Sequence, residues 1–490
     1  MERFERKIMM KPVSIAVATL LVGGVGLVAP VHAETLSEAL VSAYQSNPTL
    51  QARRLLGRAT DELVPQALSG WRPTVTLEGS AGYEKINYDL KTYTDKTLSP
   101  LSAGVTVQQN IFQGFRTVAA VDQAEANVAA ERAALKSVEQ TVLLDVVTAY
   151  FTLIRDQAVL DLNKNNEEVL QRQLEAAQDR FRVGEITRTD VAQAESRLAA
   201  AVASRIAAEG TLATTRANYE KVVGHTPKQL ETPRLEVKLP QTMEDAVDVA
   251  RRSNPDITSA EYTWDAAKAS IRDARGQLLP TVNAKAAVSW DQGSSVEDLD
   301  TTSVGASLVV SMPLYEGGAT YSAIRDAKHR AGQRRVQVDE QRDTVIEKVS
   351  STWQSLESAK ARVTSYGSQI DAATIALDGV KREAQVGSRT TLDVLDAEQE
   401  LLQARVNLAG AQRDTAVYTY QLLAAIGQMT ADTLALNTPL HDPQRHYDDV
   451  RGQWLGGNAW ADRDAALGQD KDITDDVTQE NISIDSGSVR

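Results

Sequence analysis

Cysteine is absent from the 490-residue chain, and aromatic residues make up only 5% of it. The lack of cysteine excludes disulfides, thiolate metal ligands, cysteine nucleophiles and a lipidated N-terminal cysteine. Few aromatics are unusual for a large enzyme core but typical of long helices rich in alanine and leucine. Basic charge is also scarce, because 66 Asp and Glu outnumber 52 Lys and Arg and give a net charge of −14. An acidic chain lacks the basic face that neutralises phosphates, so nucleic acid is not an expected partner.

The longest hydrophobic run lies at the N-terminus. Basic residues near the start precede an apolar stretch from Val13 to Val28, and Val31-His32-Ala33 is suited to cleavage after Ala33. This order is typical of a secretory signal peptide at residues 1–33, with an uncleaved inner-membrane anchor as the alternative. No later run of about 18 apolar residues follows. The sequence therefore predicts an exported chain without a transmembrane helix.

The remaining sequence contains an internal duplication. Ser46-Asn47-Pro48 recurs as Ser253-Asn254-Pro255 at an offset of 207, and Asp190-Val191 recurs as Asp393-Val394 at an offset of 203. One shorter loop in the second half accounts for the change in offset. We therefore interpret 34–224 and 241–428 as two structural repeats joined by a linker at 225–240. The C-terminal segment, 429–490, is acidic and is expected to be disordered after about residue 461.

Each repeat has the same predicted order of a helix, two strands, a very long helix and a further helix. Residues 116–182 and 319–386 contain no proline. At 1.5 Å per residue each would form a helix about 100 Å long, and helices of that length need long neighbours. Each repeat has an opening helix, interrupted at its Asn-Pro, and a closing helix. Stacked end to end, these two would equal the long helix in length. A tubular helix bundle is therefore predicted.

Four segments alternate apolar and polar residues. They are residues 75–83, 101–107, 282–290 and 303–311. Strands of an outer-membrane barrel show this alternation, and so do strands of an ordinary half-buried sheet. Four strands cannot close a membrane barrel, and an open edge in lipid leaves backbone groups unpaired. Membrane-spanning strands would therefore need partners from other copies of the chain, with two, three or four copies all possible.

Several motifs, in this order, resemble the TolC-type outer-membrane efflux and type I secretion channels. They are the repeated Ser-Asn-Pro, Pro313-Leu314-Tyr315-Glu316-Gly317-Gly318, and Val386-Gly387-Ser388-Arg389-Thr390 leading into Leu392-Asp393-Val394-Leu395-Asp396-Ala397-Glu398. The resemblance covers roughly residues 34–437 and implies an α+β membrane protein. Its homotrimer would form one β-barrel from four strands per chain above a long helical tube in the periplasm.

The same resemblance implies a function without catalysis or cofactor. The trimer would be a passive exit duct from the periplasm across the outer membrane of a Gram-negative bacterium. It would work with a periplasmic adaptor protein and an inner-membrane transporter. The cargo would be small toxic compounds and drugs, or secreted polypeptides.

The resemblance also implies roles for residues at the periplasmic tip of the tube. Asp393 and Asp396 match two aspartates that ring the tunnel entrance, and three residues' spacing places them on one helix face. Gly184 and Gly387 mark the two helix turns at the tip. A ring of carboxylates would favour cations, as charged rings do in other channels. Helix capping is the alternative for Asp393, because it follows a glycine-containing turn.

Arg389 matches an arginine of the entrance gate, for which Thr189 and Asp190 would be the partners. Asp190 could equally cap a helix, and Arg389 could be an ordinary solvated charge. The sequence also departs from the family at one gate position. A tyrosine expected five residues before Arg389 is replaced by Ala384.

Two other classes of protein are alternatives to a channel. An enzyme is not favoured, because the sequence contains no phosphate-loop or nucleophile-elbow motif. The five histidines also lack the spacing of metal ligands. A periplasmic coiled-coil scaffold or adaptor would share the long helices but not the repeated strand pairs. Aromatic residues near the predicted strand ends fit a membrane-interface girdle or ordinary hairpin packing; they are Trp71, Tyr83, Tyr88, Tyr93, Phe112, Trp290 and Tyr315. One hypothesis for 441–454 is a collar packed on the tube.

Overall fold

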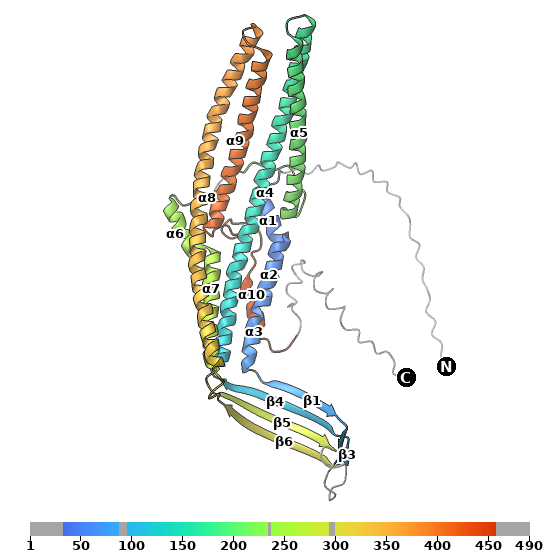
Figure 1. Cartoon of the computed structure of the whole chain (residues 1–490), viewed down its shortest axis with the longest axis vertical. Helices are drawn as coiled ribbons and strands as arrows, with labels where there is room; N and C mark the ends of the chain where they lie inside the picture. The colour runs from blue at the N-terminus through green and yellow to red at the C-terminus, as the bar shows by residue number, and fades with distance from the viewer. Residues whose placement is uncertain (1–32, 88–95, 234–236, 294–298, 457–490) are drawn as a thin grey trace, which may run out of the picture.

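The computed structural model describes residues 33–87, 96–233, 237–293 and 299–456. They form an elongated helical body with a four-stranded sheet at one end (Figure 1). The predicted signal peptide, apart from Ala33, lies outside the described residues. So do Tyr88, Tyr93 and the acidic segment after residue 456.

The helices divide between the two halves of the chain. The first half contains α1 (Leu36–Ser46), α2 (Pro48–Asp61), α3 (Leu63–Leu68), the 3₁₀ turn η1 (Ser69–Trp71), α4 (Arg116–Arg182) and α5 (Arg188–Val223). The second contains α6 (Met243–Ser253), α7 (Pro255–Gly276), α8 (Ala319–Gln385) and α9 (Thr391–Ala425), followed by α10 (Pro443–Arg451). Both very long helices are confirmed, at 67 residues each. The predicted interruptions at Asn47-Pro48 and Asn254-Pro255 are also confirmed, because each proline begins a new helix.

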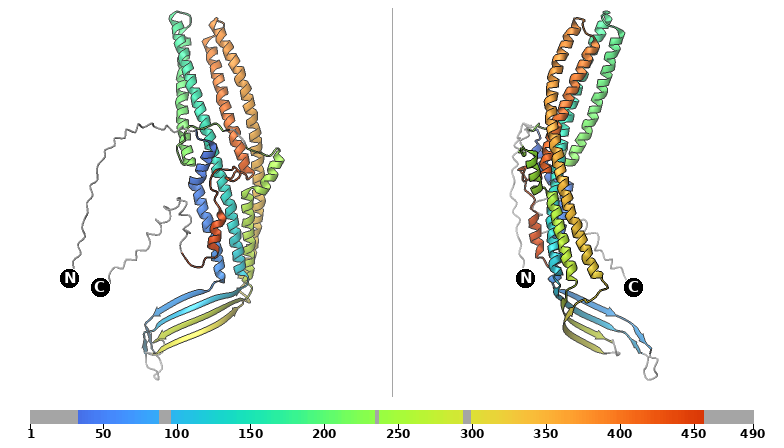
Figure 2. Two further views of the ribbon diagram at one scale, coloured as in Figure 1. Left: turned by 180° about the vertical axis from the view of Figure 1, so that it is seen from behind. Right: turned by 60° about the vertical axis from the view of Figure 1, so that its left-hand side comes forward.

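The long helices run the length of the body, and the shorter ones lie beside them (Figure 2). α4 contacts α1, α2 and α3 toward the sheet and α5 toward the opposite end, while α8 contacts α6 and α7 and then α9. Among the described helices, α4 has an 18-residue window long and apolar enough to cross a membrane. Half of that window is buried inside the structure.

The repeated Ser-Asn-Pro forms a joint between stacked helices. The Asn47 amide donates to the Val222 carbonyl at 3.0 Å, and the Asn47 Oδ1 accepts from a backbone N–H of the first turn of α2. In the second half, the Asn254 amide donates to the Ala425 carbonyl at 2.9 Å, and its Oδ1 caps α7 in the same way. Each asparagine therefore satisfies unpaired backbone groups of two helix ends. The predicted end-to-end stacking of closing and opening helices is observed.

The main apolar core lies at the level of these joints, with residues from α1, α4, α5, α6, α8 and α9. Tyr150 and Tyr219 are fully buried there. The Tyr219 hydroxyl donates to the Glu34 carboxylate at 2.8 Å, and the Tyr150 hydroxyl lies 2.8 Å from the Glu34 carbonyl and 2.7 Å from the Glu231 carbonyl. Burial raises the pKa of both tyrosines, so they remain neutral hydrogen-bond donors. They tie the start of the predicted mature chain to the linker between the halves.

The sheet has the order β1-β4-β5-β6, with every neighbouring pair antiparallel. Its strands are β1 (Thr74–Ala81), β4 (Leu101–Gln113), β5 (Thr281–Gln292) and β6 (Asp300–Ser311), and β2 (Glu84–Ile86) pairs with β3 (Lys96–Leu98) as a short separate ribbon. The four predicted strands are confirmed, although β4 continues past the predicted end at residue 107. The two halves meet at the β4–β5 pair. β1 and β6 are the two edges of the sheet.

The register places the apolar residues of all four strands on one face. Leu77 lies opposite Val105, Val105 opposite Val288, and Val288 opposite Val304. The next row on the same face is Val75, Val107, Ala286 and Ala306. The residues between them, such as Thr76 and Thr106, lie on the other face. Every residue of β1 and β6 is exposed in the single chain, so neither face of these strands is covered.

α10 packs the C-terminal segment against α2 and α3. Its Tyr447 and Val450 are buried, and Arg132 of α4 lies 5.0 Å from the Tyr447 ring centroid. His446 Nδ1 is 3.1 Å from the carboxylate of Asp61, which is buried. The segment hypothesised to be a collar thus packs on the side of the helical body.

Candidate functional site at the helical tip

The two helix turns at the end of the body farthest from the sheet have the same construction (Figure 1). Gly184 and Gly387 have φ of +80° and +79°, a conformation that glycine adopts without a Cβ penalty. Their N–H groups donate to carbonyls in the last turns of α4 and α8. The preceding valines, Val183 and Val386, are exposed to solvent. The predicted turn residues therefore end both long helices.

Asp190 and Asp393 each complete a capping box at the start of the returning helix. Asp190 Oδ2 accepts from the Thr187 N–H at 2.9 Å and from its hydroxyl at 2.8 Å, and Asp393 makes the same two contacts with Thr390. These hydrogen bonds to the charged carboxylate hold the pKa of both aspartates below the ordinary value. The capping alternative is thus observed at both positions. Capping uses one oxygen of each carboxylate and leaves the charge in place.

Arg389 pairs with its own hairpin in the single chain. Its Nε donates to Glu383 Oε2 at 2.9 Å, and this contact raises the pKa of Arg389. Thr189 is exposed and belongs to the other hairpin, formed by α4 and α5. A link from Arg389 to Thr189 and Asp190 stays a prediction about contacts between neighbouring chains.

Asp396 is engaged by a residue that the sequence analysis did not single out. Arg197 of α5 donates to Asp396 Oδ1 at 2.5 Å and joins the α4–α5 hairpin to the α8–α9 hairpin. The neighbouring Leu395 is only 2% exposed and packs with Leu170 and Ala201 of the other hairpin. The signal in the sequence is a difference between the halves. At the offset of 203, Arg197 corresponds to Glu400, so the two halves carry opposite charges at this position.

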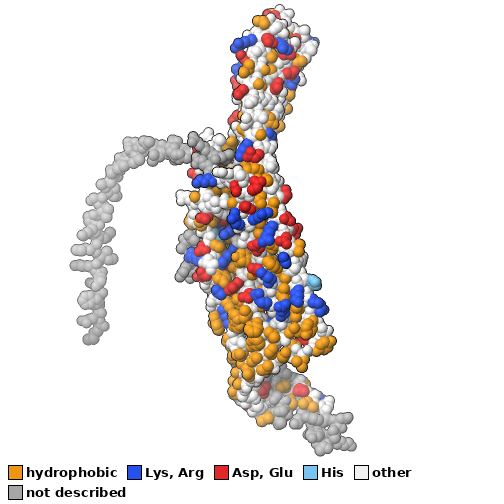
Figure 3. All heavy atoms as spheres, turned by 90° about the vertical axis from the view of Figure 1, so that its left-hand side faces the viewer, with side chains coloured by type: hydrophobic (Ala, Val, Ile, Leu, Met, Phe, Trp, Pro, Cys, Tyr) orange, Lys and Arg blue, Asp and Glu red, His pale blue; other side chains and the backbone are white. Residues whose placement is uncertain are grey.

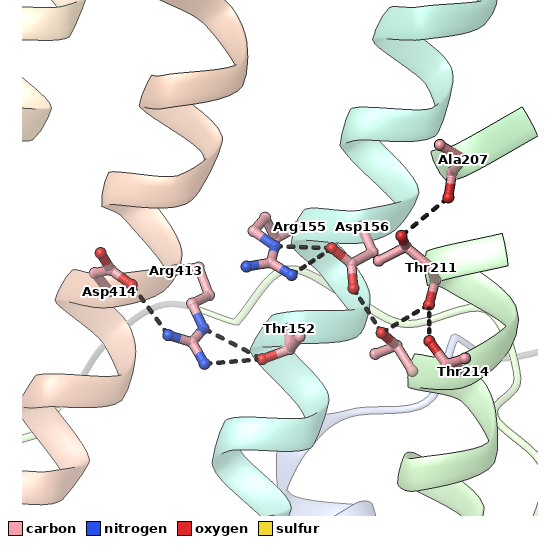
Figure 4. Close-up of polar contacts among 9 residues, drawn as sticks. Thr152, Arg155, Asp156, Ala207, Thr211, Thr214, Arg413 and Asp414 are labelled. Atoms are coloured by element: carbon pink, nitrogen blue, oxygen red, sulfur yellow. Dashed lines mark hydrogen bonds and ion pairs between the residues drawn. The ribbon is translucent and has the colours of Figure 1, made fainter. Parts of the chain in front are cut away.

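A second polar link joins the hairpins lower in the body (Figure 4). Arg413 of α9 donates to the Thr152 hydroxyl of α4 at 3.1 and 3.2 Å and pairs with its neighbour Asp414 at 3.0 Å. One turn along α4, the buried Asp156 accepts from Arg155 and, at 2.6 Å, from the Thr215 hydroxyl of α5. Helices α9, α4 and α5 are thereby connected at one level.

The surface near the sheet is apolar rather than charged. On the face of α6, α7 and α8, hydrophobic side chains gather on the part of the body next to the sheet, and charged ones gather farther away (Figure 3). Tyr262 of α7, Leu279 of the following turn and Tyr321 of α8 are exposed in the single chain. No group of His, Asp and Glu suited to a metal ion occurs among the residues that the structure describes. The arrangement offers apolar surface, open strand edges and a charged tip, which are properties of a subunit that assembles with others.

Comparisons with known proteins agree with this arrangement. The family model for outer membrane efflux proteins matches residues 39–225 and 246–428. The outer membrane efflux protein BepC of Brucella suis is 38% identical over 445 residues, which cover 90% of this chain and 96% of that protein. The outer membrane protein TolC of Escherichia coli is 26% identical over 448 residues, covering 88% and 90%. Among solved structures, the CmeC outer membrane channel of Campylobacter jejuni superposes with a TM-score of 0.73 at 14% identity, covering 85% of this chain and 89% of that one.

Proposed function

The chain belongs to the outer membrane efflux protein family, and from this premise we propose that it is one subunit of a homotrimeric exit duct. Its sheet lies in the outer membrane, and its helical body extends into the periplasm. The duct exports small toxic compounds and drugs, secreted polypeptides, or both. Movement through it is passive, and the energy comes from an inner-membrane transporter.

The observation that carries this proposal is the four-stranded sheet with two open edges and one continuous apolar face. A row such as Leu77, Val105, Val288 and Val304 suits contact with lipid. The unpaired backbone groups of β1 and β6 cannot remain open in hydrocarbon, where each costs several kcal/mol. Pairing β6 of one chain with β1 of the next satisfies both edges. Three chains of four strands close such a barrel within the size range of membrane barrels.

The apolar patch on α7 and α8 supports the same assembly. Exposed contiguous apolar surface of this kind marks interaction sites on soluble proteins. In the trimer it would be covered by a neighbouring subunit directly beneath the barrel. Aromatic residues at the strand ends, such as Trp71, Tyr83 and Tyr315, are exposed and would lie at the membrane interfaces.

The helical tip is the proposed entrance of the duct. Asp393 and Asp396 from each subunit would ring it, and Gly184 and Gly387 would form the turns that a periplasmic adaptor contacts. The exposed Val183 and Val386 supply apolar contact for that adaptor. Arg389 would hold the entrance shut through Thr189 and Asp190 of a neighbouring subunit.

Each half of the duplicated chain would form one part of the wall of the helical tube. We infer repeats at 34–224 and 241–428, a linker at 225–240 and a C-terminal segment at 429–490. The two family-model matches support this division, as does the order that the halves share, of opening helices, a pair of long strands, a 67-residue helix and a closing helix. The described first part of the linker contacts this level of the body, where the Tyr150 hydroxyl lies 2.7 Å from the Glu231 carbonyl.

Single-channel conductance of the detergent-solubilised protein in a planar bilayer tests the proposal. We expect cation-selective pores, and we expect Asp393→Ala/Asp396→Ala to lose much of that selectivity while still forming pores. Unchanged selectivity in the variant would keep the duct but remove the aspartates from its entrance. A folded oligomer that forms no pores, and that fractionates with the soluble periplasm, would indicate a scaffold instead.

A further inference from the structure

The two aspartates of the proposed entrance differ in their charge environment. Asp393 accepts its hydrogen bonds from the neutral Thr390, and the nearby Arg389 acts on it only through space, because Arg389 makes its ion pair with Glu383. Asp396 instead receives the guanidinium of Arg197 at 2.5 Å. Since a guanidinium in direct contact cancels most of a carboxylate's field, the two positions do not contribute equally to an acidic ring.

The contact between Arg197 and Asp396 also depends on how the two hairpins lie. Arg197 is on α5 and Asp396 is on α9, 199 residues apart in the chain. Leu395, buried against Leu170 and Ala201, holds the two helices together one residue from the ion pair. Any motion that separates the hairpins must withdraw Leu395 and break the pair at the same time.

We propose that Arg197 sets the charge of the entrance by neutralising Asp396 while the hairpins are together and uncovering it when they separate. The inference rests on the proposed duct. Closed, the entrance carries one aspartate per subunit without a direct ion pair, Asp393. Open, it carries two, so the attraction of the entrance for cations and for positively charged cargo increases on opening.

The test measures the reversal potential of single channels in a salt gradient at low ionic strength, where charges are weakly screened. Arg197→Gln removes the cation and keeps a long polar side chain, and we expect the cation-to-anion permeability ratio to rise about twofold or more. Asp396→Asn should lower the ratio, because Arg197 is then left without its partner. The double variant Arg197→Gln/Asp396→Asn should return close to the wild-type ratio, because one positive and one negative charge are then removed together.

Arg205→Gln is the matched control. Arg205 lies two turns farther along α5 and pairs with Glu167 and Glu209 inside its own hairpin. It should leave the permeability ratio unchanged. If Arg197→Gln also leaves the ratio unchanged, or if the double variant stays as far from the wild-type ratio as a single variant does, the assignment of Arg197 is overturned.

Hydrogen exchange of the purified oligomer gives a readout that needs no pore. Arg197→Gln should speed exchange severalfold at the start of α9 and in the facing part of α5, whereas Arg205→Gln should not affect α9. Wild-type protein that forms no pores would contradict the proposed duct, and the exchange result would then still test the contact between Arg197 and Asp396. Unchanged exchange at α9 in Arg197→Gln would overturn it.

Discussion

Two glycines with nearly the same backbone conformation have different neighbours. Gly427 has φ of +81°, and a Cβ there would lie 2.4 Å from the Ser253 carbonyl oxygen at the joint between α9 and α7. Gly387 has φ of +79° at the tip, but a Cβ would meet no atom within 4 Å. Gly427 is therefore required both by its positive φ and by its close neighbours, whereas Gly387 is required by its positive φ alone.

We expect Gly387→Ala to cost about 1–2 kcal/mol, the usual penalty of a left-handed residue with a Cβ. Gly427→Ala should cost more, about 3 kcal/mol or above, because the joint must also move to relieve the clash. Denaturant unfolding of the two variants, compared with wild type, measures the difference. Equal destabilisation would show that the joint yields easily and is not a fixed point of the body.

The capping aspartates make the tip sensitive to acid. A carboxylate whose folded-state pKa is lowered stabilises the fold fully above its unfolded pKa and loses that contribution as pH falls through the lowered value. The pKa values of Asp190 and Asp393 are both lowered by their Thr partners. We therefore expect the first turns of α5 and α9 to fray below about pH 4 and to be insensitive to pH between 5 and 8.

Hydrogen exchange, corrected for its intrinsic pH dependence, measures this fraying. Asp393→Asn should abolish the acid response at α9 and leave that of α5 intact. The α5 response, which depends on Asp190, is thus the internal control. An acid response of α9 that persists without the Asp393 carboxylate would assign it to another group.

The same residues show what the sequence could predict. The capping boxes follow from local spacing, since a Thr three residues before an Asp suffices to recognise them. Arg197 could not be identified as the partner of Asp396, because their contact depends on how two hairpins lie, not on spacing along one helix. The contrast with Glu400 in the other half was visible, but its meaning required the structure.

Among the elements, the long helices were predictable and the sheet only partly so. The absence of proline over residues 116–182 and 319–386 predicts α4 and α8. Alternation specifies which face of a strand is apolar, but it does not specify which strands pair. The order β1-β4-β5-β6 was therefore beyond the sequence. β4 was predicted too short because residues 108–110, Gln-Gln-Asn, interrupt the alternation, and α10 was not recognised because few of its residues are apolar.

Adjacent residues of β4 offer a direct test of the two faces. Val105 lies in the apolar row and Thr106 on the opposite face. We expect Val105→Arg to destabilise the membrane-inserted form by about 2–4 kcal/mol, the cost of arginine near the middle of a bilayer. Thr106→Arg, facing the lumen of the proposed barrel, should cost much less. Folding into lipid vesicles, followed by titration with denaturant, compares them, and a larger effect of Thr106→Arg would reverse the assignment of the faces.

For the whole molecule, the sheet edges and the apolar surface point to the same requirement. β1 and β6 are exposed on both faces and unpaired at their outer edges in the single chain. The apolar patch beside the sheet lies on the helical body as well (Figure 3). Neither is covered by a described part of the same chain. Association of several copies covers both at once.

Closure of the barrel predicts that β1 of one subunit pairs with β6 of the next. The absence of native cysteine makes this testable, since introduced cysteines are the only ones present. Leu77→Cys on β1 would be combined in turn with Val304→Cys, Ala306→Cys and Leu308→Cys on β6, all on the apolar face. Directly opposed strand residues bring their Cβ atoms to about 4.5–5.5 Å, close enough for a disulfide after small adjustment. We expect one register to give covalent dimers and trimers on a non-reducing denaturing gel after mild oxidation.

Val105→Cys, combined with the same β6 cysteines, is the control for this experiment. β4 is an interior strand with a partner on each side in its own chain, so its cysteine should form no cross-link between subunits. Monomers alone from all three β1–β6 combinations would contradict a shared barrel. Dimers that never extend to trimers would mean instead that the edges pair but close with a different number of chains. Only the β1–β6 contact completes the sheet, so this pairing determines whether the chain becomes a pore at all.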